Sequence, residues 1–295
     1  MRETFPTPGP VLLSLRVPDG SIELEAVETD ETDVEVEPLN EAAREALDSA
    51  RIELRQRPGG GQEVVVELDD SSRRFGFLRQ GPQFRLDIRC PRGAEVELKT
   101  GAADVEGSGQ FAGLDIKSGS GDIAFELVEG EAAVKTASGD VSLGRVREET
   151  TIHTASGDVD VAYAGGALTV YGASADVTIG YLLGPGSVKL ASGDLSIGAL
   201  EASLDAGTAS GDQEIKAVSQ GTLNLQSASG DVAVGVCQGS RLWVDARSRS
   251  GTTSSELEMS ETPVEDEGPL VELRAATMSG DVRVFRAPAR SDIEA

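Results

Sequence analysis

The sequence predicts an all-β protein: a parallel β-solenoid, similar to a β-helix, with coils of about 18 residues and an irregular N-terminal cap that contains one short helix. Three observations predict this fold. A corner motif recurs at a nearly constant spacing of 18 residues, and apolar and polar residues alternate after each corner. The 295 residues include 35 glycines but only 4% aromatics. The glycines follow no three-residue period, which excludes collagen, and the 39% hydrophobic content argues against disorder.

The corner motif is Ala-Ser-Gly-Asp with close variants. Its aspartates follow one another at equal steps of one repeat length from Asp104 to Asp212, and the next step is longer by a single residue. A degenerate corner at Ser250-Gly251-Thr252 comes next, and a last aspartate follows it. Glycine permits the positive φ of a tight bend, while aspartate can accept hydrogen bonds from nearby backbone N–H groups. We predict a turn ladder of stacked aspartates, formed by Asp104, Asp122, Asp140, Asp158, Asp176, Asp194, Asp212, Asp231 and Asp281.

Each repeat contains two short strands. Apolar residues lie one and three positions after each aspartate, as at Val159, with Gln213 as an exception. A second apolar cluster centres twelve positions after the aspartate, as at Val170. This period of two is typical of half-buried strands. Identical corners favour coils stacked in register, so that Val141, Val159 and Val177 would share one interior column. An antiparallel meander folded as a sandwich is the alternative.

The two ends of the chain depart from the repeat. Residues 11–37 and 51–89 alternate as strands do, and Asn40 is a candidate N-cap for a short helix at about 41–50. An acidic insertion at 256–269 lies between late strands. A solenoid must cover the open edge of its first coil, so an irregular cap is expected there. The predicted regions are an N-terminal cap at 1–100 with a hairpin loop at 69–82, solenoid repeats at 101–287 and a flexible tail at 288–295.

Several motifs together resemble a known family. They are the opening Phe5-Pro6-Thr7-Pro8 followed by paired strands, the short helix near 41–50, the repeated corners and the closing Ser279-Gly280-Asp281-Val282. Over nearly its whole length the chain resembles the bacterial β-strand-repeat putative adhesin family, domain of unknown function 4097, also called Toastrack. The resemblance implies a β-solenoid-like fold, no catalytic residues to carry over, and an association with cell-envelope stress systems.

Charge and cysteine content exclude several classes of function. The 51 acidic residues against 26 basic ones give a formal charge of -25 and a pI near 4.3, so nucleic acids and anionic membranes would be repelled. Cys90 and Cys237 form no CxxC pair, which argues against a disulfide scaffold and a thiolate zinc site. No apolar run or signal peptide is apparent, so we expect no membrane insertion and a cytoplasmic protein.

The aspartate ladder is the first candidate site. Stacked carboxylates repel one another, so each is expected to accept turn N–H bonds and to remain solvated. A row of weak Ca²⁺ sites is the alternative, but a single aspartate in each repeat supplies few oxygens, and we expect no metal and no cofactor. His153 should point outward without a catalytic role, because it follows the inward-facing Ile152. Cys237 takes the repeat position of Val218 and should be a buried structural thiol.

A second candidate is a basic loop with aromatic residues in an otherwise acidic chain. One interpretation is a capping hairpin whose aromatic rings cover the first coil, and the other is a loop that docks a partner. The residues concerned are Arg73, Arg74, Phe75, Phe77 and Arg79.

The sequence favours a non-catalytic β-solenoid that acts as a binding or scaffolding module for a protein or polymer partner. A polysaccharide-active β-helix enzyme is one alternative. It would need aromatic platforms, and the chain has one tryptophan, Trp243, and three tyrosines, of which Tyr163 and Tyr181 share a repeat position. Self-assembly by end-to-end stacking is another, which the cap and the charge disfavour. No catalytic residue stands out, and the oligomeric state is left open.

Overall fold

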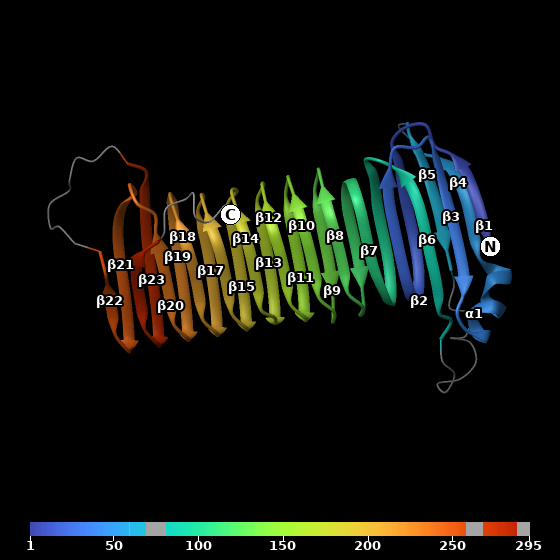
Figure 1. The fold of residues 1–295 in the computed structure, drawn as a ribbon. Coiled ribbons are helices and arrows are strands. Elements are labelled where there is room, and N and C mark those ends of the chain that lie inside the picture. The colour runs from blue at the N-terminus through green and yellow to red at the C-terminus, as the bar shows by residue number, and fades with distance from the viewer. Residues whose placement is uncertain (59, 69–80, 258–267, 288–295) are drawn as a thin grey trace. The chain divides into compact units, whose positions relative to one another are not determined.

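A computed structural model describes residues 1–58, 60–68, 81–257 and 268–287 (Figure 1). The chain forms two compact units, Met1–Glu148 (unit 1) and Glu149–Ala295 (unit 2). In the described part, strands dominate and helical structure is confined to α1 (Glu41–Ala46) and the 3-10 turn η1 (Leu47–Ser49). Neighbouring strands in the repeats pair in parallel at a spacing of one repeat, as Val159 and Val177 do. The predicted all-β solenoid is confirmed, and the alternative of an antiparallel sandwich is wrong.

Unit 1 begins with irregular strands and continues into the repeats. The strands β2 and β7 are long because each continues around a corner of its coil. The strands of unit 1 are β1 (Arg2–Pro6), β2 (Val11–Val27), β3 (Glu31–Pro38), β4 (Arg51–Gln56), β5 (Gln62–Glu67), β6 (Phe84–Pro91), β7 (Ala94–Ser118), β8 (Ile123–Val128), β9 (Ala132–Thr136) and β10 (Val141–Val146).

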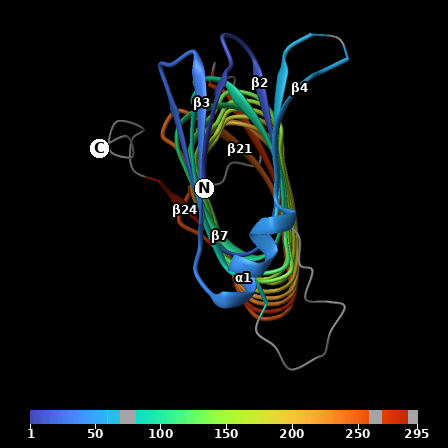
Figure 2. The same ribbon diagram turned by 90° about the vertical axis from the view of Figure 1, so that its right-hand side faces the viewer.

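The first strands of unit 1 are paired out of sequence order. Strand β2 pairs in parallel with β7 along one edge and with β5 and β6 along the other. Antiparallel strands then end the sheet, since β3 pairs with β6, β1 with β3, and β4 with β5. Helix α1 lies beside β3 (Figure 2), with Ala43 and Ala46 buried. Its N-cap is Asn40, whose Oδ1 accepts a hydrogen bond from Ala43 N at 2.8 Å.

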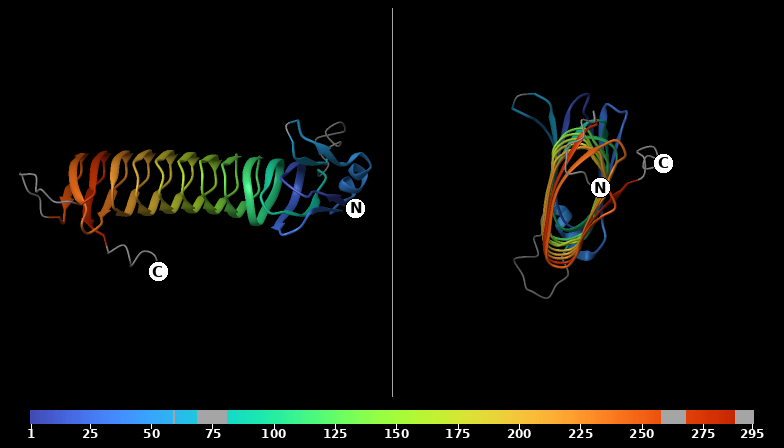
Figure 3. Two further views of the ribbon diagram at one scale, coloured as in Figure 1. Left: turned by 90° about the horizontal axis from the view of Figure 1, so that it is seen from above. Right: turned by 90° about the vertical axis from the view of Figure 1, so that its left-hand side faces the viewer.

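Unit 2 consists of regular coils, which Figure 3 shows end-on as flattened rings. Odd-numbered strands form one face of the coils and even-numbered strands form the other. The strands are β11 (Thr150–Ser156), β12 (Val159–Ala164), β13 (Leu168–Ser174), β14 (Val177–Leu182), β15 (Gly186–Ser192), β16 (Leu195–Leu200), β17 (Leu204–Ser210), β18 (Gln213–Val218), β19 (Gly221–Ser229), β20 (Val232–Val236), β21 (Arg241–Ser250), β22 (Thr253–Ser255), β23 (Leu270–Ser279) and β24 (Val282–Arg286).

The core consists of columns of equivalent repeat residues. Val177 pairs with Val159 on one side and with Leu195 on the other, and all three are buried. In unit 1, Val141 pairs in the same way with the buried Ile123. Gln213 continues the column of Val177 and is 1% exposed. Its Nε2 donates to the carbonyl oxygen of Gln226 at 2.8 Å, which compensates the burial of half of its amide.

The last two coils of unit 2 are stacked in reverse sequence order. Strand β23 lies between β19 and β21 (Figure 1). Strand β24 pairs with β20 on one side and with β22 on the other. If the coils were stacked in sequence order, the degenerate corner at Thr252 would contact Asp231. Instead, Asp281 N donates to Asp231 Oδ1, and Asp281 Oδ1 accepts from Thr252 N, both at 2.7 Å. Among the described residues, no further coil stacks on this outermost corner, so threonine suffices there.

Candidate functional site

The aspartate ladder is built from one hydrogen bond that recurs between coils. Each carboxylate accepts the backbone N–H of the corner residue in the next coil, at 2.7 to 3.0 Å. One oxygen of each aspartate therefore holds neighbouring coils in register. Hydrogen bonds from the backbone and side chain of Thr252 lower the pKa of Asp281. The acceptors are Asp104 and Asp122 in unit 1 and Asp158, Asp176, Asp194, Asp212, Asp231 and Asp281 in unit 2.

Two aromatic pairs lie on opposite faces of the coils in unit 2. His153 on β11 stacks on Tyr171 of β13, with ring centroids 4.9 Å apart and the planes at 17°. Tyr171 is 40% exposed. Tyr163 of β12 lies opposite Tyr181 of β14. The shared repeat position predicted the tyrosine pair; the histidine stack was not predicted, although Tyr171 follows His153 by one repeat length.

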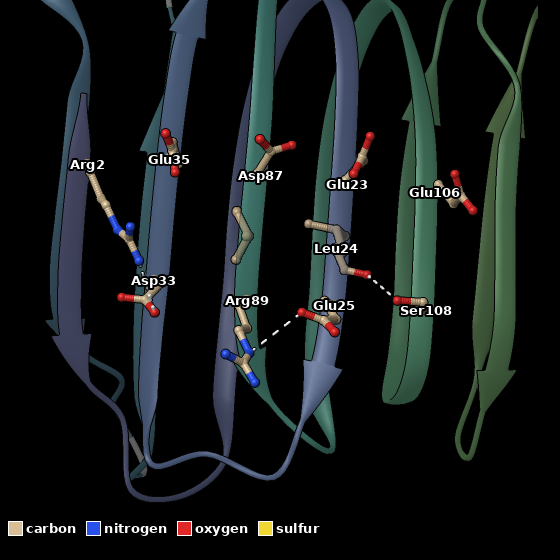
Figure 4. A pocket seen from close by; sticks show the side chains of 11 residues that line it. Arg2, Glu23, Leu24, Glu25, Asp33, Glu35, Asp87, Arg89, Glu106 and Ser108 are labelled. Atoms are coloured by element: carbon tan, nitrogen blue, oxygen red, sulfur yellow. Dashed lines mark hydrogen bonds and ion pairs between the residues drawn. The ribbon is translucent and has the colours of Figure 1, made fainter.

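The most distinctive polar feature is a pocket of about 380 Å³ on the outer face of unit 1, shown in Figure 4. We name it the acidic pocket. Strands β1, β3, β6, β2 and β7 lie beside one another under it. Its lining residues are Arg2, Glu23, Leu24, Glu25, Asp33, Glu35, Asp87, Ile88, Arg89, Glu106 and Ser108.

Four carboxylates form one row across the acidic pocket. Glu23 lies opposite Glu106 on β7 and opposite Asp87 on β6. Asp87 in turn lies opposite Glu35 on β3. Paired strands are about 4.8 Å apart, and like charges directly opposite each other destabilise a sheet. This acidic row therefore repels itself.

Asp87 lies at the centre of the acidic row. Its Oδ1 is buried and accepts no hydrogen bond from the described residues. Burial raises the pKa of Asp87, and the negative charges of Glu23 and Glu35 raise it further, while Arg85 acts in the opposite direction. A cation that entered the pocket would favour the charged form of this group.

The two arginines of the pocket contact carboxylates of a second row, in which Glu25, Arg89 and Asp33 lie opposite one another. Arg89 lies 3.6 Å from Glu25, and Arg2, which is opposite Glu35 in the strand register, turns its guanidinium to within 3.8 Å of Asp33. Within the described residues, none of the four carboxylates of the acidic row has a basic group within 4.0 Å. The acidic row is therefore the less compensated of the two and leaves its carboxylates open to a positively charged ligand.

The family profile of Toastrack (DUF4097) matches residues 12–184 and 168–285 of this sequence. The chain belongs to the Toastrack family. The Toastrack chain is also similar to two solved structures at 10% identity each. A putative cell adhesion protein from Clostridium sporogenes gives a TM-score of 0.30, with 97% of this chain and 99% of that one covered. A putative adhesin from Bacteroides fragilis gives 0.39, with 96% of each covered. No curated protein matches the sequence.

Other candidate residues of this Toastrack chain lie elsewhere. The basic loop with Arg73, Arg74, Phe75, Phe77 and Arg79 falls outside the described residues. Among the described residues, no group of three or more histidine, cysteine or acidic side chains is placed to hold a metal ion. In the same part of the chain, no helix combines the length and apolarity needed to cross a bilayer.

Both cysteines of the Toastrack chain are buried. Cys237 does not take the repeat position of Val218, because the register shifts and Val236 lies opposite that valine. A one-residue irregularity in the strand explains why the spacing from Asp231 assigned Cys237 to the wrong repeat position. Cys90 is 0% exposed, and burial, with a smaller effect of Glu25, raises its pKa to about 12.

We expect Cys90 to resist alkylation in the folded protein. Its thiolate is the reactive form and is scarce at pH 8 when the pKa is about 12. Iodoacetamide should label Cys90 at least about 100-fold more slowly in buffer than in concentrated urea, as followed by peptide mass spectrometry. Equal labelling rates in the two solutions would show that the thiol is accessible.

Proposed function

We propose that this Toastrack protein is a non-catalytic binding module whose acidic pocket binds a positively charged segment of a protein partner. The observation that carries the proposal is the row of Glu106, Glu23, Asp87 and Glu35, four carboxylates on adjacent strands with their cationic neighbours paired to another row. Such a row costs stability in the free protein, and a bound cationic chain would relieve the repulsion.

The dimensions of the pocket suit an extended basic segment. Side chains on one face of an extended chain are about 6.8 Å apart, and paired strands of the row are about 4.8 Å apart, so the long side chains of successive lysines or arginines can reach carboxylates one or two strands apart. The overall charge of -25 would steer such a partner toward the surface. In a scaffolding role, or in the association with cell-envelope stress systems that the family resemblance implies, the acidic pocket would hold the protein partner.

The test is binding of a fluorescent peptide of about ten alternating lysines and serines, measured by polarisation at low and moderate salt. The pocket variant carries Glu23→Gln, Glu35→Gln and Asp87→Asn. The matched control carries Asp160→Asn, Asp205→Asn and Glu214→Gln, three exposed residues of unit 2, and changes the net charge equally. We expect about a tenfold loss of affinity for the pocket variant and less than about twofold for the control.

Two results would overturn this proposal. If the wild-type protein does not bind the basic peptide, the acidic pocket is no site for a cationic segment. If both triple variants lose affinity equally, the binding reflects net charge and does not involve the pocket. An acidic peptide of equal length should not bind at all, and thermal unfolding should show that both variants are folded.

A further inference from the structure

The outermost strand of unit 2, β21, leaves one edge without a strand partner among the described residues. It pairs with β23 along its other edge. Its inward-facing Leu242, Val244 and Ala246 are only half-buried. The equivalent residues one coil further in are at most 2% exposed, and they are Val271, Leu273 and Ala275. Apolar surface and backbone are therefore both open at this edge.

The backbone groups that face the open edge can be assigned from the pairing. Arg241 N donates to the carbonyl oxygen of Pro269 at 2.8 Å, so residue 241 faces β23. In a parallel pair, the N–H and C=O of one residue point to the same side, and those of the next residue point away. Leu242, Val244, Ala246 and Ser248 therefore offer their N–H and C=O groups to a further strand.

The outward side chains of β21 make the strand complementary to itself. The strand carries Arg241, Arg247 and Arg249 against Asp245, an excess of positive charge in a chain of net charge -25. Within one copy, Arg247 Nη2 already lies 2.8 Å from Asp245 Oδ2, so pairing with a second copy would let each group contact its counterpart on both strands. Antiparallel pairing of two copies centred on Ala246 would place Asp245 opposite Arg247 of the other copy, twice. The same register would place Trp243 opposite Arg249, twice.

Charge selects this register over its neighbour. Centring the pair on Asp245 would place the two aspartates opposite each other and Arg241 opposite Arg249, which are like-charge pairs. Trp243 is 47% exposed, and the guanidinium of Arg274 already lies 5.4 Å from its ring. Its environment is therefore suited to a further cation–π contact.

We propose that two copies of this chain associate through β21, forming a two-fold antiparallel strand pair centred on Ala246. The interaction is isologous, so it closes at a dimer and does not propagate. It would satisfy the free N–H and C=O groups of Val244, Ala246 and Ser248 in each copy and bury Leu242 and Val244 at the junction. The proposal is independent of the acidic pocket.

Sedimentation of the full-length protein tests this proposal with a charge swap. Asp245→Arg places arginine opposite arginine, and Arg247→Asp places aspartate opposite aspartate. Each should raise the dimer dissociation constant at least about tenfold, while the double variant Asp245→Arg, Arg247→Asp should restore it to within about threefold. Asp205→Arg, an exposed change on β17, is the control and should leave the dimer intact.

Hydrogen exchange provides a second measurement. The amides of residues 244, 246 and 248 should be protected in the wild-type protein and should lose protection in Asp245→Arg, while β17 stays protected in both. A wild-type protein that is monomeric at about 100 µM would overturn the proposal. A dimer that is unaffected by either single charge reversal would overturn it as well.

Discussion

Replacing Gly211 with alanine is expected to destabilise the protein by about 3 kcal/mol or more. Gly211 lies at a ladder corner of unit 2 with φ at 143°, a conformation that residues with a Cβ rarely adopt. An added Cβ would lie 2.0 Å from the carbonyl oxygen of Gly193 in the adjacent coil. The backbone would have to move, and the hydrogen bond from Asp212 N to Asp194 Oδ1 at 2.8 Å would be strained. Urea unfolding followed by circular dichroism measures the loss.

Gly207, four residues earlier on β17, is the matched control. A Cβ added there would contact nothing within 4 Å, and its backbone is not in the left-handed region. Gly207→Ala should change the unfolding free energy by less than about 1 kcal/mol, since alanine only restricts the unfolded chain. Equal effects at the two positions would mean that the corners tolerate a side chain and do not stack as described.

The second large effect is expected at the interior column of β14. Ile179 is 0% exposed and lies between Val161 and Ile197 of the neighbouring coils. Truncation to alanine removes three carbons from a site that its neighbours cannot refill, because the strands on both sides fix their positions. We expect Ile179→Ala to lower the unfolding free energy by about 2–5 kcal/mol, as measured by urea or thermal unfolding.

Thr178→Ala is the control for Ile179→Ala, because it changes the adjacent residue on the exposed face of the same strand. Its effect should be within about 0.5 kcal/mol. If the threonine substitution proves as costly as that of the isoleucine, the assignment of inward and outward faces in β14 is incorrect.

The repeats were predictable because their contacts join equivalent residues one repeat apart. Val159 and Val177 lie opposite each other at a separation of one repeat, and so do the ladder aspartates. Every coil repeats the same pattern of residues, so residues one period apart in the sequence are in contact in the structure. The N-cap at Asn40 is equally local, since its partner Ala43 is three residues away.

The acidic pocket and the order of the last coils were not predictable from the sequence. The acidic row joins Glu23, Glu35, Asp87 and Glu106, which no repeat relates. Alternation alone indicated that these side chains face outward. Which of them lie side by side depends on β6 pairing with both β2 and β3, and many strands of similar composition could have taken those edges.

The amino-acid sequence by itself determined the coil, its length, the inward residues and the aspartate corners, because all of these arise from local periodicity. Only the tertiary structure decided that β23 enters between β19 and β21, leaving β21 outermost. The physical reason is that each open strand edge offers the same backbone hydrogen bonds to any incoming strand. The choice then depends on which corner can donate and accept along the ladder, and Asp281 does both while Thr252 only donates its N–H.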